Sequence, residues 1–206
     1  MIKTNQLFDI NSDCINQASL ILNQLFANYP LHIGFFPKDS QRERKSRIFL
    51  EFALRYSIKF GIAQAISPRF EGIALWLPPS KKNFEFSKTL RSGTFAGWVQ
   101  LSKDFLLHVL PIANHLESIR LHVIREPHWY LLYIGVECEY QGKGYSTKLI
   151  NHMLEKIDTS KKYCYLETHT EKNVQIFQRF GFQVADVSRI PTTDITNWAM
   201  LRPPKQ

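Results

Sequence analysis

The sequence predicts a single α/β domain, in which a sheet of several strands is covered by helices. The chain has 206 residues, which is the size of one domain with a substantial core. Its second half alternates runs typical of buried strands with runs of helical spacing. Its first half combines long amphipathic patterns with two short strand patterns. Together these three observations favour one mixed domain.

The first half of the chain is expected to form helices around a pair of strands. A first helix begins at a Ser12 or Asp13 cap, runs to about Ala27 and is broken by Asn28-Tyr29-Pro30. Apolar spacing then predicts a helix over about 39–60, strands over 61–67 and 70–77, and a helical stretch over about 85–124 that Gly93, Gly97 and Pro111 interrupt.

The second half begins with the most apolar strand pattern of the chain, over 129–136. A glycine-containing loop follows it, and the next apolar residues are spaced as in a helix. The remaining segments alternate in the same way, and Gly181 is a natural helix end. The predicted elements are a helix over 147–157, a strand over 163–168, a helix over 171–180 and a strand over 182–187.

The loop from Val136 to Ser146 is predicted to bind a pyrophosphate. Gly142 and Gly144 have no Cβ, so the chain can turn tightly there and bring backbone N–H groups close to phosphate oxygens. The following helix adds the positive end of its dipole. A P-loop and a dinucleotide-binding fingerprint both require glycine spacings that this loop lacks.

This loop resembles the acetyl-coenzyme A binding motif of the GNAT N-acetyltransferase superfamily. That motif reads Gln or Arg, two residues, Gly, one residue, then Gly or Ala, and Gln141, Gly144 and Ser146 stand at its key positions. Ser146 departs from the motif, but it is small and its hydroxyl can itself bond a phosphate. The elements that follow, with Asn173 near the start of a helix and the run Arg179-Phe180-Gly181-Phe182, are in the order of that superfamily.

Within the superfamily the chain most resembles puromycin N-acetyltransferase-like proteins. Three segments carry this similarity: Phe26-Ala27-Asn28-Tyr29-Pro30, Glu126-Pro127-His128-Trp129-Tyr130-Leu131, and Leu166-Glu167-Thr168 with Asn173. The resemblance implies the GNAT fold, with a mixed, mostly antiparallel sheet flanked by helices. It implies one domain over 1–206, with an acceptor-side half over about 1–125 and a coenzyme-binding half over about 126–202.

The resemblance also implies the reaction, in which an acetyl group passes from acetyl-coenzyme A to the primary amine of a small molecule. The amine would attack the thioester directly, without a covalent enzyme intermediate. A backbone N–H of the strand around 134–136 would polarise the thioester carbonyl. The residues implied to contact the coenzyme are Ile134, Val136, Gln141, Gly142, Lys143, Gly144, Tyr145, Ser146, Asn173 and Phe177.

Glu167 is the predicted catalytic base. Alternate residues of a strand share a face, so Glu167 should lie beside Tyr165 and Tyr163 and point away from Cys164. A carboxylate partly desolvated by these aromatic rings would have a raised pKa and could take a proton from the amine. The resemblance assigns the matching Glu this role. The alternative is a glutamate in an ordinary surface ion pair.

Phe177 marks a departure from the family pattern. Puromycin N-acetyltransferase and many relatives have a Tyr at this place, whose hydroxyl protonates the departing thiolate, and a phenylalanine ring has no hydroxyl. Water, Tyr145 or His169 could supply the proton, or the protonated amine could deliver it as the intermediate collapses. A protein that binds coenzyme A with little turnover is the other possibility.

Aromatic residues before the second half are candidates for the acceptor site. They are Tyr29, Phe35, Phe36 and Trp98, and together they would suit an acceptor with a flat or apolar body. Ordinary core packing is the alternative for each of them. His128 and His169 flank strands of the site and are interpreted as structural or rim histidines.

Other sites and partners are not favoured by the composition. His108, His115 and His122 would lie about 10 Å apart along a helix, too far to share a metal, so no metal is expected. The net charge of +8 occurs in short clusters, so coenzyme phosphates are a better match for it than nucleic acid. No apolar run approaches the roughly 20 residues that cross a membrane.

Three unpaired cysteines and the absence of an apolar leader point to the cytoplasm. Protein or peptide N-acetylation, a coenzyme A binding regulatory module and a basic scaffold for nucleic acid stay open as alternative functions. The sequence also leaves open the identity of the amine and whether the protein is a monomer or a dimer.

Overall fold

The computed structural model describes residues 7–36, 40–79 and 103–205. Two short 3-10 turns, Ser12–Cys14 and Cys138–Tyr140, precede α1 and the glycine loop. The helices and strands in chain order are β1 (Phe8–Asp9), α1 (Ile15–Phe26), α2 (Pro30–Phe35), α3 (Arg42–Phe60), β2 (Ile62–Ala65), β3 (Gly72–Leu77), α5 (Lys103–Val123), β4 (Trp129–Val136), α6 (Tyr145–Thr159), β5 (Cys164–Thr168), α7 (Glu171–Gln178), β6 (Gln183–Arg189) and β7 (Thr196–Arg202).

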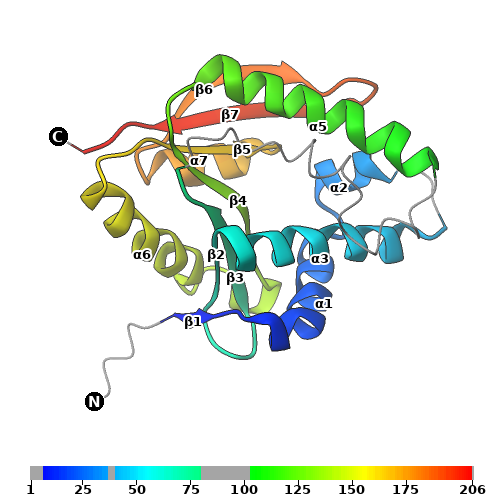
Figure 1. The fold of residues 1–206 in the computed structure, drawn as a ribbon, viewed down its shortest axis with the longest axis horizontal. Helices are drawn as coiled ribbons and strands as arrows, with labels where there is room; N and C mark the ends of the chain where they lie inside the picture. Colours follow the sequence, from blue (N-terminus) through cyan, green and yellow to red (C-terminus); the bar gives the residue numbers. More distant parts are fainter. Residues whose placement is uncertain (1–6, 37–39, 80–102, 206) are drawn as a thin grey trace.

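The described strands form one seven-stranded sheet in the order β1-β2-β3-β4-β5-β7-β6. Neighbouring strands are antiparallel except for β4 and β5, which are parallel. The parallel pair is joined by the crossover helix α6, as such pairs require. The expected mixed, mostly antiparallel sheet flanked by helices is therefore confirmed (Figure 1).

Both faces of the sheet are covered, because successive side chains of a strand point to opposite sides. On β3, Ile73 and Leu75 pack against α1 and α3, whereas Ala74 and Trp76 belong to the core under α6 and α7. Helix α5 packs against β7 and β6 (Figure 1). Ile124, directly after α5, meets Tyr165 of β5 in a further small core.

The sheet opens between its two parallel strands. β4 and β5 pair only from Trp129 to Leu131 opposite Cys164 to Leu166, although both strands continue beyond this point. On its other edge β4 stays paired with β3 as far as Val136, with an extra residue, Leu132, between the partners of Leu75 and Trp76. The diverging ends of β4 and β5 therefore leave a gap inside the sheet.

Several features of the first half differ from the prediction. Helix α2, which was not predicted, begins at Pro30, the last residue of the predicted break, since proline is favourable at the first helical position. Helix α3 begins at Arg42, and residue 39 lies outside the described residues. Pro111 does not interrupt α5, because Val109 and Ile112 on either side of it are buried and fix both turns. The predicted breaks at residues 93 and 97 lie outside the described residues.

Two strands were missed by the sequence prediction. β1 has two residues, which is too short for a hydrophobic pattern, and it is formed by pairing with β2. β7 contains Asn197 and Arg202 among apolar residues and was not predicted. It lies between β5 and β6, and pairing on both edges stabilises it where its own sequence pattern does not.

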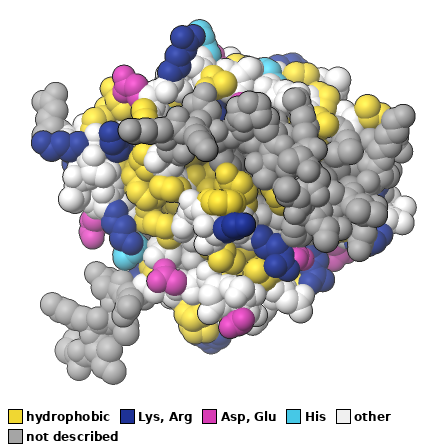
Figure 2. Space-filling model, viewed as in Figure 1, with side chains coloured by type: hydrophobic (Ala, Val, Ile, Leu, Met, Phe, Trp, Pro, Cys, Tyr) yellow, Lys and Arg dark blue, Asp and Glu magenta, His cyan; other side chains and the backbone are white. Residues whose placement is uncertain are grey.

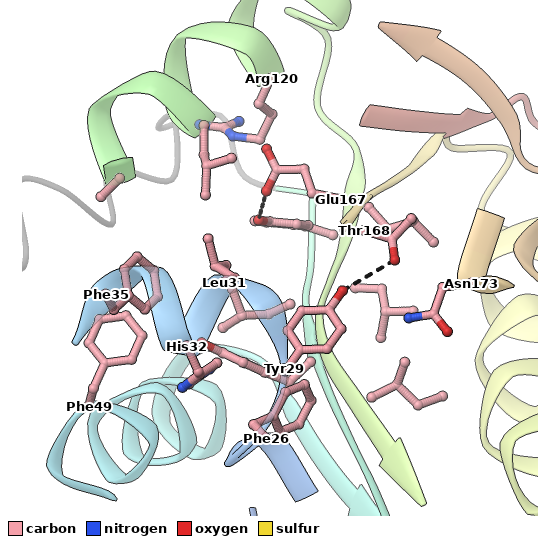
Figure 3. Close-up of a pocket in the computed structure, with 18 of the residues that line it drawn as sticks. Phe26, Tyr29, Leu31, His32, Phe35, Phe49, Arg120, Glu167, Thr168 and Asn173 are labelled. Carbon is pink, nitrogen blue, oxygen red and sulfur yellow. Dashed lines mark hydrogen bonds between the residues drawn. The ribbon is translucent and has the colours of Figure 1, made fainter. Parts of the chain in front are cut away.

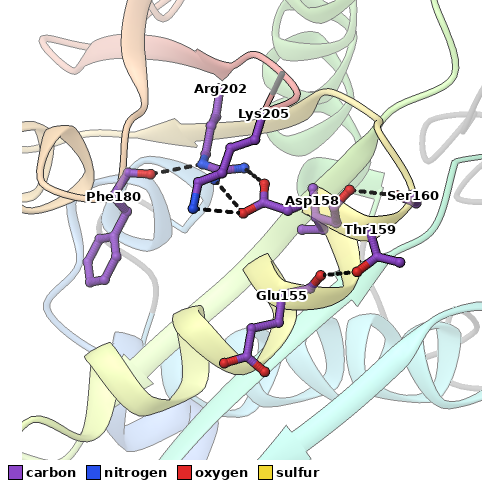
Figure 4. A network of polar contacts seen from close by, with 8 residues as sticks. Glu155, Asp158, Thr159, Ser160, Phe180, Arg202 and Lys205 are labelled. Carbon is purple, nitrogen blue, oxygen red and sulfur yellow. Dashed lines mark hydrogen bonds and ion pairs between the residues drawn. The ribbon is translucent and has the colours of Figure 1, made fainter.

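Arg202 ties together the ends of three elements on the side of the sheet away from the gap. Its guanidinium donates two hydrogen bonds to Asp158 at the end of α6, at 2.6 and 3.0 Å, and its Nε donates to the Phe180 carbonyl after α7 (Figure 4). Lys205 Nζ lies 3.2 Å from the same Asp158 carboxylate. We call these four residues the Arg202 cluster.

Charged side chains on the described surface are shown in Figure 2 for one face of the molecule. On the face drawn in Figure 2, Lys and Arg side chains are scattered among acidic and apolar ones. None of the helices in the described part of the chain is long and apolar enough to pass through a membrane.

Candidate active site

A cavity of about 120 Å³ lies at the gap between β4 and β5. Tyr133 and Glu167 line it from the face that carries α1 and α5, and Leu166 and Phe177 line it from the face that carries α6 and α7. The cavity therefore passes from one face of the sheet to the other through the opening (Figure 3). A long thin ligand can enter from one face and meet a second ligand from the other.

The glycine loop adopts the geometry that the sequence predicted. Gly142 and Gly144 have φ angles of +75° and +80°, in the left-handed region that favours glycine. A Cβ at either position would meet no atom within 4 Å, so the space in front of the loop is open. Gly144 caps α6, and the first amides of that helix have no partner within the helix. This open set of N–H groups suits a pyrophosphate.

The other loop residues pack around these amides. The Gln141 side chain donates to the Val136 carbonyl at 3.1 Å, which holds the loop against the end of β4. The rings of Tyr140 and Tyr145 stack with centroids 5.6 Å apart, and the Lys143 ammonium lies 5.0 Å from the Tyr140 ring centre. Tyr145 is therefore held outside the cavity lining.

Two amides of β4 point into the gap. The Glu137 amide donates to the Glu71 carbonyl on the β3 side, so the amides of Gly135 and Tyr133 face the same way. The amides of Ile134 and Val136 must point to the opposite edge, which β5 has left. Before Leu132 the odd-numbered amides face β5, as the Trp129 amide does. The extra residue Leu132 shifts the alternation by one, so that after it the even-numbered amides face β5.

The Glu167 carboxylate lies at the cavity wall and is held by two phenol groups. Tyr130 donates to its Oε2 at 2.7 Å and Tyr165 to its Oε1 at 2.8 Å. Burial raises the pKa of Glu167 to about 7, although both hydrogen bonds and the charge of Arg120 act to lower it. The carboxylate can therefore gain and lose a proton near neutral pH.

Asn173 and Phe177 of α7 line the cavity on the side away from Glu167. The Thr170 side chain caps this helix by accepting the Asn173 backbone N–H, and this fixes where both side chains point. Phe177 is buried and its ring packs against Phe182. The structure thus brings Ile134, Glu167 and the two α7 residues to one cavity.

The predicted acceptor residues divide into two groups. Tyr29 and Phe35 line the cavity, whereas Phe36 is buried beside it and is not part of its lining (Figure 3). Trp98 lies outside the described residues. Sequence reasoning missed further lining residues of the apolar wall, which come from α1, α2, α3, α5 and β4: Phe26, Leu31, His32, Phe49, Ala113, Leu116, Leu132 and Tyr133.

Two polar neighbours of Glu167 were also missed. Tyr130 lies beside Glu167 because it pairs with Tyr165 across the parallel strands, and Arg120 comes from α5 above them. The run around Tyr130 carries part of the family resemblance, but its contact with Glu167 follows only from the register of β4 against β5. For Arg120 the sequence carries no comparable signal.

The histidines have structural contacts. His128 Nδ1 lies 2.6 Å from the Glu126 carbonyl and the ring packs edge-on against Tyr165. His169 is buried next to Tyr29, and burial lowers its pKa to about 4. His115 contacts Ser188 of β6 at 3.1 Å. Among the described residues no group of three or more His, Cys, Asp or Glu side chains is arranged to hold a metal ion.

Comparison with known proteins identifies the family of this chain. The sequence profile described as Acetyltransferase (GNAT) family matches residues 64–182, more than half of the chain. An uncharacterised N-acetyltransferase of Schizosaccharomyces pombe is 35% identical over 117 residues, which are 55% of this chain and 47% of that protein. The matched chain thus spans under half the length of this relative.

Solved structures share the fold over almost the whole chain. A structure from Corynebacterium glutamicum, described as histone acetyltransferase HPA2 and related acetyltransferase, has a TM-score of 0.67 and 21% identity, over 98% of this chain and 97% of that one. A polyamine N-acetyltransferase of Drosophila melanogaster has a TM-score of 0.67 and 13% identity, over 96% and 99%. The family profile and the fold agree, and the chain belongs to the GNAT acetyltransferase family.

Proposed function

We propose that this protein transfers the acetyl group of acetyl-coenzyme A to the primary amine of a small molecule by direct attack. One observation carries the proposal: the Glu167 carboxylate, whose pKa is raised by burial to about 7, lies in the cavity that joins the two faces of the sheet. A base of this pKa can deprotonate an amine at neutral pH.

The glycine loop and the open edge of β4 would hold the acetyl donor. The amides around Gly144 suit the pyrophosphate, and the gap leads from the end of β4 to the cavity wall at Ile134. The amides of Ile134 and Val136 point into this gap, where they can polarise a thioester carbonyl. The contacts of Lys143, Tyr145 and Ser146 with the coenzyme remain part of this proposal.

Glu167 would take the proton from the attacking nitrogen. The Tyr130 and Tyr165 hydroxyls hold the carboxylate in one orientation, so that its remaining lone pairs can face the amine. Removing the proton leaves a neutral nitrogen bonded to the carbonyl carbon, and collapse of this intermediate expels the thiolate. Cys164 is buried on the opposite face and burial raises its pKa, so it is not placed to act as a nucleophile.

The acceptor is inferred to be a small amine with an apolar, flat body. The wall on the Glu167 side is built largely from rings, among them Phe26, Phe35 and Phe49. Puromycin-type acceptors, suggested by the sequence resemblance, also carry an aromatic body and stay a prediction.

A thiol-release assay with a panel of amines tests the proposal. We expect ring-bearing monoamines to be acetylated with higher kcat/KM than linear polyamines or peptides. Ala113→Leu should narrow the apolar wall and raise KM for the larger ring-bearing amines, and Ala185→Leu on the exposed strand β6 is the matched control. Better turnover with peptides or whole proteins would contradict the small-molecule assignment.

A coenzyme A binding protein with little turnover is the second candidate. Phe177 favours it, because no hydroxyl is present at the place where relatives protonate the thiolate. Tight binding of acetyl-coenzyme A by calorimetry, without thiol release from any amine in the panel, would decide for this function and against the first.

A further inference from the structure

Tyr29 brings a hydroxyl group to the end of β5 from a distant part of the chain. It stands just before α2, and its ring packs edge-on against Phe26 and His169, with centroids 5.5 and 5.6 Å apart. The hydroxyl oxygen accepts the backbone N–H of His169 at 3.1 Å and lies 3.2 Å from both Thr168 Oγ1 and His169 Nδ1. The hydroxyl is therefore held in one place by several contacts (Figure 3).

This place is across the strand from the proposed base. Glu167 and Thr168 are successive residues of β5, so their side chains point to opposite faces of the sheet. The contact with Thr168 puts the Tyr29 hydroxyl on the far side of the strand from the Glu167 carboxylate, in the same cavity. Asn173 and Phe177 line the cavity on that side.

Three other groups considered as proton donors, Tyr130, Tyr145 and His169, are less well suited than Tyr29. Tyr130 donates its proton to Glu167. Tyr145 stacks on Tyr140 outside the cavity lining. His169 has a pKa lowered to about 4 by burial, so it is neutral at pH 7 and cannot act as a strong acid there.

We propose that Tyr29 supplies the proton to the departing coenzyme A thiolate, in place of the hydroxyl that Phe177 lacks. This inference rests on the proposed N-acetyltransferase function. The amine nitrogen bonds to the carbonyl carbon and loses a proton to Glu167. The carbon–sulfur bond then breaks with its electron pair on sulfur, the Tyr29 O–H bond breaks, and an S–H bond forms. Solvent water returns the proton from Glu167 to the Tyr29 phenolate.

The surroundings of Tyr29 suit a donor of this kind. Burial raises the pKa of Tyr29, which keeps the phenol protonated over the pH range of an assay. The same burial makes a departing thiolate more basic than it is in water, so it accepts a proton more readily. Hydrogen bonds with the Thr168 side chain, the His169 amide and the Asn173 side chain act against this rise, because they stabilise the phenolate that forms.

The test is Tyr29→Phe, which keeps the ring and removes the hydroxyl. Acetyl-coenzyme A and a saturating ring-bearing amine are mixed, and the single-turnover rate constant is measured. We expect a loss of about 10²-fold, within the usual contribution of a positioned acid. The dissociation constant of acetyl-coenzyme A, measured by calorimetry, should change less than about threefold. Tyr163→Phe, which removes a hydroxyl from a residue that does not line the cavity, is the matched control and should keep the wild-type rate.

A second acetyl donor separates proton donation from a structural role. In a coenzyme A analogue with fluorine next to the sulfur-bearing carbon, the thiol is more acidic and its thiolate needs a proton less. The defect of Tyr29→Phe should then shrink at least tenfold. An equal defect with both donors, or no defect with either, would overturn the role of Tyr29 while leaving the enzyme assignment intact. Wild-type protein that binds acetyl-coenzyme A but acetylates no amine would overturn both.

Discussion

Two carboxylates of this domain, Glu167 in the cavity and Asp158 in the Arg202 cluster, have opposite environments. Glu167 accepts hydrogen bonds from two neutral phenols, and burial raises its pKa to about 7. Asp158 faces Arg202 and Lys205, whose hydrogen bonds lower its pKa. The two sites are drawn in Figures 3 and 4. Glu167 lies near the end of β5, whereas Arg202 pairs with Cys164 at the start of that strand.

The difference shows that the charge of the hydrogen-bond donors decides whether a carboxylate is suited to proton transfer or to stabilising the fold. Neutral donors orient Glu167 without fixing its charge, so its proton can come and go. Cationic donors fix the charge of Asp158, and the ion pair ties α6 to β7. A carboxylate with phenol partners is therefore suited to proton transfer, and one with a guanidinium partner is suited to holding elements together.

The largest expected effect is on turnover. Glu167→Gln keeps the shape of the side chain and removes the proposed base, so kcat should fall by about 10² or more, with the affinity for acetyl-coenzyme A unchanged. Asp158→Asn should keep kcat per folded molecule. Steady-state kinetics measures kcat for both variants. Similar losses of kcat in the two variants would contradict the different roles inferred for Glu167 and Asp158. Near-normal turnover of Glu167→Gln between pH 6 and 9 would place the base elsewhere.

Arg202→Met should produce the largest loss of stability. It leaves Asp158 without its main partner and removes the bond to the Phe180 carbonyl, at a cost of about 3 kcal/mol in the free energy of unfolding. Urea denaturation measures this loss. Arg189→Met, at an exposed ion pair with Asp194, is the control and should cost well under about 1 kcal/mol. Equal losses of unfolding free energy in the two variants would show that burial does not determine how much an ion pair stabilises this fold.

A carboxylate introduced into the glycine loop tests a third environment, in which a negative charge should oppose ligand binding. Gly144→Asp introduces a negative charge beside the expected pyrophosphate and a side chain where φ is +80°. The affinity for acetyl-coenzyme A should fall by well over tenfold, as measured by calorimetry. Gly144→Asn carries the same backbone strain without the charge and should lose less. If both variants bind acetyl-coenzyme A as wild type does, the loop is not the pyrophosphate site.

The smallest effect should be visible in the pH dependence of stability. The folded pKa of Glu167, about 7, lies above its unfolded value of about 4.3, so the folded state binds more protons and stability falls as pH rises from about 4 to 7. The lowered pKa of Asp158 has the opposite sign: its contribution is present above about pH 4 and is lost on acidification below it.

Urea titrations across this pH range test these two signs. Glu167→Gln should remove the decline of stability between pH 4 and 7, and Asp158→Asn should weaken the decline below pH 4. An unaltered curve for Glu167→Gln would mean that its pKa is not raised.

The parts of the fold predicted from sequence are those whose patterns are local. The strand, glycine loop and helix around Gly144 were expected because apolar period and turn residues are local signals. The strand β7 was missed because its stability comes from pairing with strands on both sides, which no local pattern contains. Pro111 was expected to interrupt a helix that tertiary packing instead maintains.

The same distinction holds for the site. The shared face of Tyr165 and Glu167 follows from the period of one strand and was predicted. The contact of Tyr130 depends on the register of two strands, and that of Tyr29 depends on a segment 139 residues away. The division into an acceptor-side half and a coenzyme-binding half stays a prediction. Tyr29 and Arg120, both from the first half, line the same cavity as Glu167 from the second half.

The gap between β4 and β5 also has a consequence for hydrogen exchange. The amides of Ile134 and Val136 lie in a central strand, where slow exchange is normal, yet they point to an edge that has no strand beside it. In the free protein their protons should exchange nearly as fast as those of a sheet edge. The pantetheine arm of acetyl-coenzyme A carries amide groups of its own, and in the gap it would take the place of the missing strand. Binding would then slow exchange at two positions deep inside the sheet.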